Sequence, residues 1–301
     1  MIKKILLLTV LLLLTASCLQ QPFGEREADG TEGVEINFMQ NHPPSRIYEN
    51  NPLEVVLELR NMGVFDEPEG KITLHGYDSS VISFQGEYDE QNYIETDLPS
   101  ISARTQSFSG GGYETLGFEA VESGVQVDRG GKHPTNLIAS VCYLYRTTSS
   151  PSICIVPPHA RAEDTSCTPK RVTMESQGAP IAITEVTPEV ISDRLEITAV
   201  VENKGDGEVI APKESSYEKC PFNLEEKDFD VVQVNMSIGR LPPPECDDNM
   251  VNLRNGRGII RCVFETDGVD TSGYTTQVNI KADYLYKEQA TRNIEILSLD
   301  R

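Results

Sequence analysis

Positive charge is scarce in this chain. Lys and Arg number 26 against 47 Asp and Glu, which gives the 301 residues a formal net charge of −21. Long-range attraction to nucleic acid or to an anionic membrane surface is therefore unfavourable, and no nucleic-acid partner is expected. The carboxylates also lack the spacing of a calcium-binding loop, so the acidic surface predicts solubility or adaptation to high salt rather than a metal site.

The sequence also lacks the short motifs that mark catalytic and cofactor sites. It has no GxSxG, HExxH, P-loop or GxGxxG pattern. Of its four histidines, His42, His133 and His159 adjoin prolines and His75 stands apart. The glycine run at 110–112 lacks the lysine and the following helix that a phosphate cradle needs. We therefore predict that the protein is not an enzyme and has no catalytic residues, no metal and no cofactor.

Only one long hydrophobic run is present. Residues 5–14 are apolar except for Thr9, follow Lys3 and Lys4, and precede three small residues and Cys18. The run is about half of the roughly 20 residues that a membrane-spanning helix needs, so residues 1–17 are predicted to be a signal peptide. A cysteine after small residues resembles a lipobox, although the usual leucine is displaced to Leu14. We expect a surface protein with Cys18 lipidated and holding it to the membrane; ordinary cleavage and secretion is the alternative.

Cysteine pairs at CxxC spacing are missing as well, which counts against zinc and against thioredoxin-like redox chemistry. After Cys18 an even number of cysteines remains. In an exported chain this predicts three disulfides and an oxidising, extracellular compartment. The six are Cys142, Cys154, Cys167, Cys220, Cys246 and Cys262.

An internal repeat is the most informative feature that is present. Residues 135–145 (TNLIASVCYLY) match residues 276–286 (TQVNIKADYLY) without a gap, 141 positions apart. Upstream, 55–63 (VVLELRNMG) matches 197–205 (ITAVVENKG) at an offset of 142. Two matches in the same order at nearly one offset predict two tandem copies of one β domain.

Alternating apolar residues, bounded by Gly, Pro and Asn, predict many short strands in each copy. Each copy is expected to close with a hairpin; in the first copy residues 146–152 would form the turn. In these closing strands Tyr143, Tyr145, Tyr284 and Tyr286 share the parity of the aliphatic residues. Core packing is therefore favoured over stacking on sugars. No helical period persists for three turns, so little helix is expected.

These elements predict an all-β protein of two tandem immunoglobulin-like antiparallel β-sandwiches after the N-terminal signal segment. The predicted boundaries are 1–17 for the signal peptide, 18–33 for a flexible tether, 34–158 for the first sandwich, 159–178 for a linker and 179–301 for the second sandwich.

The predicted hairpin suggests specific disulfide pairs. A register that pairs Tyr143 with Ile153 sets Cys142 opposite Cys154. The Asn-Gly turn signal within 253–260 brings Cys246 near Cys262. That leaves Cys167 with Cys220, although six cysteines allow 15 connectivities.

A strand ending in Asn-x-Gly, within a sandwich that has a closing hairpin, resembles the CARDB-type immunoglobulin-like adhesion modules of archaeal and bacterial surface proteins. The fuller pattern is similar to secreted two-domain proteins of small-genome archaea whose function is uncharacterised. It comprises residues 142–145 (CYLY), 154–158 (CIVPP), 177–184 (QGAPIAIT), 202–209 (ENKGDGEV) and 253–262 (LRNGRGIIRC). The resemblance implies fold and location more than activity.

The leading functional expectation is a lipid-anchored or secreted surface module for adhesion or structural contact, whose partner is an unidentified surface protein or glycan. One alternative is a lipoprotein that binds a small ligand or a cation. A second is a filament subunit in which a strand such as 34–38 completes a neighbour's sheet. Recognition is expected at loop ends or in the cleft between the copies.

Overall fold

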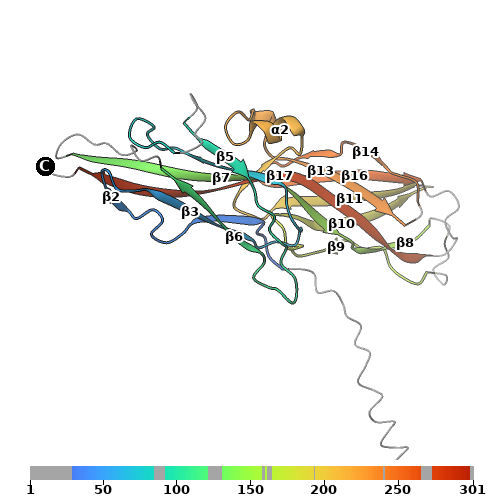
Figure 1. The fold of residues 1–301 in the computed structure, drawn as a ribbon. Helices are drawn as coiled ribbons and strands as arrows, with labels where there is room; N and C mark the ends of the chain where they lie inside the picture. The colour runs from blue at the N-terminus through green and yellow to red at the C-terminus, as the bar shows by residue number, and fades with distance from the viewer. Residues whose placement is uncertain are drawn as a thin grey trace, which may run out of the picture.

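The computed structural model describes residues 29–84, 92–120, 131–157, 160, 165–192, 194–239, 241–265 and 273–298. The molecule is elongated, and its longest strands run along the long axis (Figure 1). Within those residues, helix is limited to α2 (Glu214–Lys219) and one 3-10 turn, η2 (Glu226–Asp228). The predicted all-β class with little helix is confirmed.

Eight strands come from the first copy and nine from the part of the chain that follows it. The first set is β1 (Val34–Phe38), β2 (Arg46–Tyr48), β3 (Glu54–Asn61), β4 (Gly70–His75), β5 (Ile94–Asp97), β6 (Tyr113–Glu119), β7 (Lys132–Ser149) and β8 (Ser152–Ile155). The second set is β9 (Val172–Thr173), β10 (Ile181–Ile191), β11 (Arg194–Asn203), β12 (Glu208–Ile210), β13 (Val231–Ile238), β14 (Glu245–Cys246), β15 (Met250–Asn252), β16 (Arg257–Glu265) and β17 (Tyr274–Leu297).

Alternation of apolar and polar residues explains why these segments form strands. In β3, Val55, Leu57 and Leu59 are fully buried. Val56 and Glu58 between them are partly exposed, and Glu54 and Arg60 on either side are exposed. Successive side chains of a strand point to opposite faces, so this pattern buries one face of the sheet. The same logic holds in β13 and β16, whose buried residues also alternate.

The strands form three sheets. Two smaller sheets have the orders β1-β3-β6 and β14-β16-β11-β10-β9. The third has the order β15-β13-β17-β7-β4-β5, and β2, β8 and β12 also pair with β17. Nearly all pairs are antiparallel; β2 with β17 is parallel. The largest sheet therefore takes strands from both copies, and β9 lies in the segment predicted to be a linker.

The predicted closing hairpin is wrong for both copies, because β17 also runs without a turn from Tyr274 to Leu297. Strand β7 continues through residues 146–149 instead of turning, and β8 extends the same line after an interruption at Ser150 and Pro151. β17, with 24 residues, pairs antiparallel with both of them in one register, from Leu297 opposite Lys132 to Tyr274 opposite Ile155. β7 thus finds its antiparallel partner in the other copy (Figure 1).

This ladder has pseudo-twofold symmetry. Leu144 and Leu285 lie directly opposite each other, and their numbers differ by the repeat offset of 141. Exchanging the two copies about an axis through this pair converts the Tyr143–Tyr286 pair into Tyr284–Tyr145, which is also present. The two copies are therefore arranged like the subunits of a symmetric dimer, with one interface patch facing itself.

The last strand of each copy also enters the other half of the molecule. β8 pairs with the start of β17, whereas the end of β17 pairs with β2. One continuous cluster of buried apolar side chains includes residues of both copies. Burial of apolar surface, which dominates the stabilisation of folded domains, is therefore shared between the copies.

The three disulfides confirm one predicted pair and correct two. Cys246 and Cys262 are bonded, and they lie opposite each other in β14 and β16. Cys142 is bonded to Cys220 and Cys154 to Cys167, so the predicted Cys142–Cys154 and Cys167–Cys220 pairs are wrong. The reason is the missing hairpin: twelve residues of extended chain place Cys154 about 40 Å beyond Cys142.

Candidate functional site

A cluster of four buried tyrosines lies at the centre of the molecule. It is on one face of the largest sheet, which takes strands from both copies and which we call the shared sheet. Neighbouring rings have centroids 5.6–6.1 Å apart, mostly edge-on, which is the arrangement that aromatic pairs prefer. The predicted core position of these tyrosines is confirmed. The cluster consists of Tyr143, Tyr145, Tyr284 and Tyr286.

Each copy also fastens its Asn-x-Gly turn to one of these tyrosines. In the first copy the Tyr145 hydroxyl donates to Asn61 Oδ1 at 3.1 Å and accepts from the Phe65 amide at 3.3 Å. Asn61 Oδ1 also accepts from the Gly63 amide, while its Nδ2 donates to the Phe65 carbonyl. Both polar atoms of the buried Asn61 side chain and the Tyr145 hydroxyl are thereby paired, as burial requires.

The second copy repeats these four hydrogen bonds, and we call each set the clasp of its copy. The Tyr286 hydroxyl donates to Asn203 Oδ1 at 3.2 Å and accepts from the Gly207 amide at 2.9 Å. Asn203 Oδ1 accepts from the Gly205 amide and its Nδ2 donates to the Gly207 carbonyl. The Asn-x-Gly sequence, which predicts a turn, therefore also anchors that turn to a buried tyrosine in each copy.

The other two tyrosines hold the first strand of each copy. The Val34 amide donates to the Tyr143 hydroxyl, and the Ile181 amide donates to that of Tyr284. Burial raises the pKa of all four phenols above the ordinary value, so they stay protonated at neutral pH. The cluster serves packing and hydrogen bonding.

The equivalent positions 147 and 288 break the symmetry on this face. Thr147 is buried and donates from Oγ1 to the Ile181 carbonyl at 2.7 Å. Its counterpart at the repeat offset of 141 is Glu288, which is half-buried. Burial first, and then the charges of Glu35, Asp206 and Glu32, raise the pKa of Glu288 to about 7. A carboxyl thus stands where the other copy has a hydroxyl.

The opposite face of the shared sheet is covered on one side by an insertion. Equivalent residues of the two copies are 142 positions apart in the sequence at Phe65 and Gly207. Lys71 and Gln233 are also equivalent, because they pair with equivalent positions of β7 and β17, but they are 162 positions apart. The second copy therefore has 20 more residues here, numbers 211–230, which include α2. The Cys142–Cys220 disulfide ties this insertion to β7.

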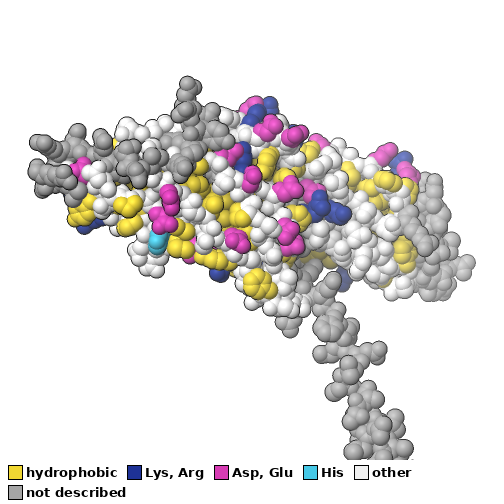
Figure 2. Space-filling view, in the orientation of Figure 1, with side chains coloured by type: hydrophobic (Ala, Val, Ile, Leu, Met, Phe, Trp, Pro, Cys, Tyr) yellow, Lys and Arg dark blue, Asp and Glu magenta, His cyan; other side chains and the backbone are white. Residues whose placement is uncertain are grey.

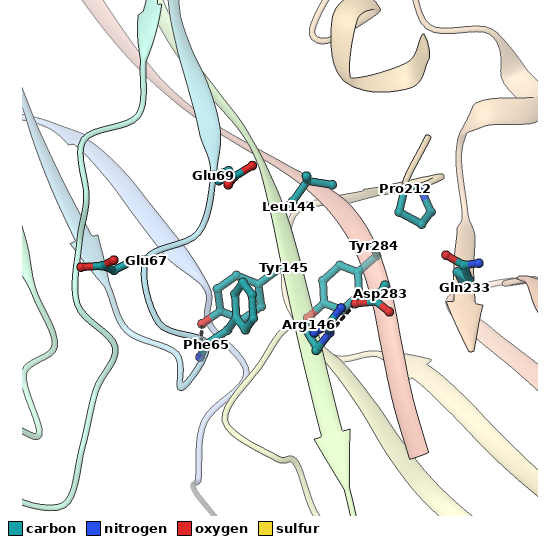
Figure 3. Close-up of a pocket in the computed structure, with 10 residues that line it drawn as sticks. All are labelled: Phe65, Glu67, Glu69, Leu144, Tyr145, Arg146, Pro212, Gln233, Asp283 and Tyr284. Atoms are coloured by element: carbon teal, nitrogen blue, oxygen red, sulfur yellow. Dashed lines mark hydrogen bonds and ion pairs between the residues drawn. The ribbon is translucent and has the colours of Figure 1, made fainter. Parts of the chain in front are cut away.

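On the other side of the pseudo-twofold axis the same face is open. A hollow of about 390 Å³, which we call the junction hollow, lies between the two copies (Figure 3). Its lining residues are Phe65, Glu67, Glu69, Leu144, Tyr145, Arg146, Pro212, Gln233, Asp283 and Tyr284. The recognition cleft expected between the copies therefore has a candidate position.

The charges of the junction hollow are arranged unevenly. Arg146 forms an ion pair with Asp283 across β7 and β17, and its guanidinium lies 6.0 Å from the centroid of the Phe65 ring. On another wall are Glu67 and Glu69 (Figure 3). No ion pair to either of these two carboxylates occurs within the described ranges of the chain. An incoming cation would find acceptors on that wall.

Beyond the hollow, the described histidines lie in separate places. His75 contacts the Ser140 hydroxyl, His133 Nε2 lies 3.3 Å from Asp78 Oδ2, and His42 contacts the Gln40 carbonyl. Among the described residues, no three His, Cys, Asp or Glu side chains are grouped so as to hold a metal ion. Figure 2 shows acidic side chains spread over the visible face rather than gathered in one patch.

Several predicted features lie outside the described residues: the signal peptide at 1–17, Cys18, most of the tether and His159. Among the residues that the structure does describe, no helix has the length and hydrophobicity to cross a membrane. The junction hollow was missed in the sequence because its walls come from both copies. The one available signal was the difference in length between the copies at 211–230.

Comparison with known proteins gives no family. No protein-family model matches the chain, and no curated protein matches it. One solved structure that aligns is a DUF4466 family protein from Parabacteroides merdae, with 7% identity over 84% of this chain and 99% of that chain. The TM-score is 0.17, so this likeness carries no argument about fold or function.

Proposed function

We propose that the chain is an exported, non-enzymatic module at the cell surface, anchored by a lipid on Cys18, that mediates adhesion or structural contact. The observation that carries this proposal is the set of three disulfides, which includes all six cysteines after Cys18. Disulfides persist in oxidising compartments and are rare in the cytosol, so they favour the exterior of the cell.

The architecture suits a structural role. Over 24 residues, the ladder between β17 and its partners is about 80 Å long at roughly 3.3 Å per residue. Backbone hydrogen bonds across it join the copies along the whole length, and the Cys142–Cys220 disulfide adds a covalent link between them. Such a body would hold loops at its two ends, and the junction hollow between them, at fixed distances from an anchor.

We further propose that each copy is a variant of an immunoglobulin-like, CARDB-type sandwich, as in archaeal surface proteins. In support, each copy contributes its own smaller sheet, β1-β3-β6 or the sheet containing β10, β11 and β16, and both copies contribute to the large sheet. Two layered sheets are the architecture of a sandwich. The strand exchange between copies is a departure from a plain tandem array.

The two alternatives are less well supported. As a strand donor in a filament, β1 would first have to leave β3, with which it forms five residue pairs in its own chain. A cation-binding lipoprotein would need a cluster of oxygen ligands. We retain both as hypotheses without a specific contact in their favour.

The experiment is expression of the tagged full chain in its native host, followed by surface labelling and mass analysis of the mature N-terminus. We expect a labelled protein that begins at a lipidated Cys18 and that captures a partner from the surface fraction. The matched variant Cys18→Ala should be released into the medium. An unprocessed chain in the cytosol, or hydrolysis of an ester, glycoside or peptide substrate abolished by one substitution, would contradict the proposal.

A further inference from the structure

The junction hollow and the main part of the insertion occupy equivalent places about the pseudo-twofold axis, and Pro212 at the start of the insertion also lines the hollow. Asp283 and Gln233 line the open hollow, and their counterparts at the same ladder positions are Cys142 and Lys71. These counterparts face the insertion, because Cys142 is bonded to Cys220 and the Lys71 ammonium donates to the Glu218 carbonyl. One of two equivalent hollows is therefore filled by the chain itself.

The filling is largely apolar. Around the Cys142–Cys220 disulfide, Ile210 and Leu285 are buried, and side chains of the insertion pack against them. The packed side chains include Tyr217, Leu224 and Phe229, and Leu144 joins them from β7. Burial of this apolar surface favours the filled state, by about 25 cal/mol per Å² removed from water.

The filled hollow also contains a cationic group, the ammonium of Lys71, which belongs to β4 and not to the insertion. The Lys71 ammonium is 3.1 Å from a Glu95 carboxylate oxygen, 3.2 Å from the Glu218 carbonyl oxygen and 5.6 Å from the centroid of the Tyr217 ring. A carboxylate, a carbonyl and an aromatic face therefore surround it, all of which attract a cation.

The open hollow has the reverse distribution of charge. Gln233 replaces the lysine and is neutral, and the one cationic side chain in the lining, Arg146, already pairs with Asp283. The wall instead provides the carboxylates of Glu67 and Glu69. An occupant of this hollow would therefore have to bring the cation with it.

We propose that the junction hollow binds a segment of a partner protein that presents Lys or Arg beside a Leu or aromatic side chain. This inference rests on the proposed function of a surface binding module and names its partner class. The volume of about 390 Å³ is within the range of roughly 300–1,000 Å³ found for binding pockets. The net charge of −21 also favours encounter with a basic partner.

The test uses the disulfide-intact chain and two synthetic peptides that copy residues 212–224 with Cys220→Ser. The basic probe carries Glu214→Lys and Glu218→Lys, and the acidic probe carries Lys213→Glu and Lys219→Glu. Binding is measured by fluorescence anisotropy at about 0.15 M salt, where exposed charges more than about 8 Å apart are screened. Circular dichroism and thermal melts show that each protein variant is folded.

We expect saturable binding of the basic probe and none of the acidic probe. The double variant Glu67→Gln/Glu69→Gln should weaken binding by about tenfold or more, which corresponds to one lost charge-assisted contact. Gln233→Lys should weaken it similarly, because it gives the open hollow the wall cation that the filled one has. The matched control Glu54→Gln/Glu189→Gln removes the same charge from exposed sites in β3 and β10 and should change affinity by less than about twofold.

Equal weakening by both double variants would show general surface attraction and overturn the proposal, as would no binding of the basic probe. Self-association that Glu67→Gln/Glu69→Gln abolishes would make a second copy of this chain the occupant, and would also overturn it. None of these outcomes would contradict the proposed function of a surface module. Conversely, failure of export or of lipidation at Cys18 would contradict the proposed function without touching the peptide result.

Discussion

Leu144 and Leu285 lie opposite each other at the centre of the longest ladder in the molecule, and the two copies are related by exchange about this pair. Symmetric dimers present the same patch twice across a twofold axis. Here the same geometry occurs within one chain, so the interface is formed by residues that the repeat offset already relates. Differences between equivalent positions, such as Thr147 and Glu288, then mark where the copies have diverged.

The clasp makes a paired prediction about Tyr145 and Tyr286. Replacement of either by Phe removes a hydroxyl that bonds the Asn side chain and a backbone amide, which leaves a half-buried amide without its partner. We expect each variant to lower the free energy of unfolding by about 1–3 kcal/mol in urea titrations. Tyr113→Phe, on an exposed residue whose hydroxyl contacts Glu58, is the control and should cost under about 0.5 kcal/mol. Equal costs at Tyr145 and Tyr113 would argue against a stabilising clasp.

The glycines of the two Asn-x-Gly turns should tolerate no side chain. A Cβ at Gly63 would overlap the Tyr145 hydroxyl, and one at Gly205 would come within 2.5 Å of the Tyr286 hydroxyl. We expect Gly63→Ala and Gly205→Ala each to destabilise the protein by about 1–3 kcal/mol or more through overpacking, measured by thermal and chemical denaturation. Gly117→Ala in β6 meets nothing within 4 Å and is the matched control. A melt of Gly63→Ala that matches the control would contradict the geometry.

Glu288 predicts a dependence of stability on pH. Its folded pKa is raised to about 7, above the ordinary glutamate value of 4.5, so the folded state binds the proton more tightly than the unfolded state. This contribution is fully present below about pH 4.5 and is lost as the pH rises through about 7. After a discount for partial solvent exposure, we expect a loss of about 2 kcal/mol across that window, measured by urea titrations at stepped pH.

The matched variant for this test is Glu288→Thr, which copies the residue at the equivalent position of the other copy, and Glu288→Gln is a second. Both should flatten the pH dependence between about 4.5 and 7, because the titrating group is removed. Glu189→Gln, on an exposed carboxylate of β10, should leave the dependence unchanged. If Glu288→Gln retains the full slope, another group is responsible for it.

The Cys142–Cys220 disulfide should hold the insertion against the shared sheet. It joins residues 78 apart in sequence, and chain-entropy arguments give about 3–5 kcal/mol for closing a loop of that length. We expect Cys142→Ser/Cys220→Ser to speed hydrogen exchange in residues 211–230 more than in β7 and β17. Cys246→Ser/Cys262→Ser, whose cysteines are 16 apart, should instead affect β14 and β16. Uniform loss of protection would show that the disulfide supports the whole fold rather than the insertion.

Much of this protein follows from local patterns in the sequence. The period-2 alternation in β3 and the tyrosine parity in β7 and β17 predict strands and their buried faces, because the direction of a side chain in a strand depends on residue parity alone. The repeat predicts two equivalent copies, and the Asn-Gly turn predicts the Cys246–Cys262 pair. Each of these conclusions needs only residues that are close in sequence or are related by one constant offset.

The tertiary structure alone decided how the copies meet. Residues 146–152 include Ser150 and Pro151 and read locally as a turn, yet the chain continues straight because β17 of the other copy provides a backbone partner along its whole length. Because the chain continues straight, Cys142 and Cys154 lie far apart, and each forms a disulfide with a cysteine other than the predicted one. It also created a junction hollow whose walls are far apart in sequence. Pairing between strands depends on which edges are brought together in space, and no local pattern records that.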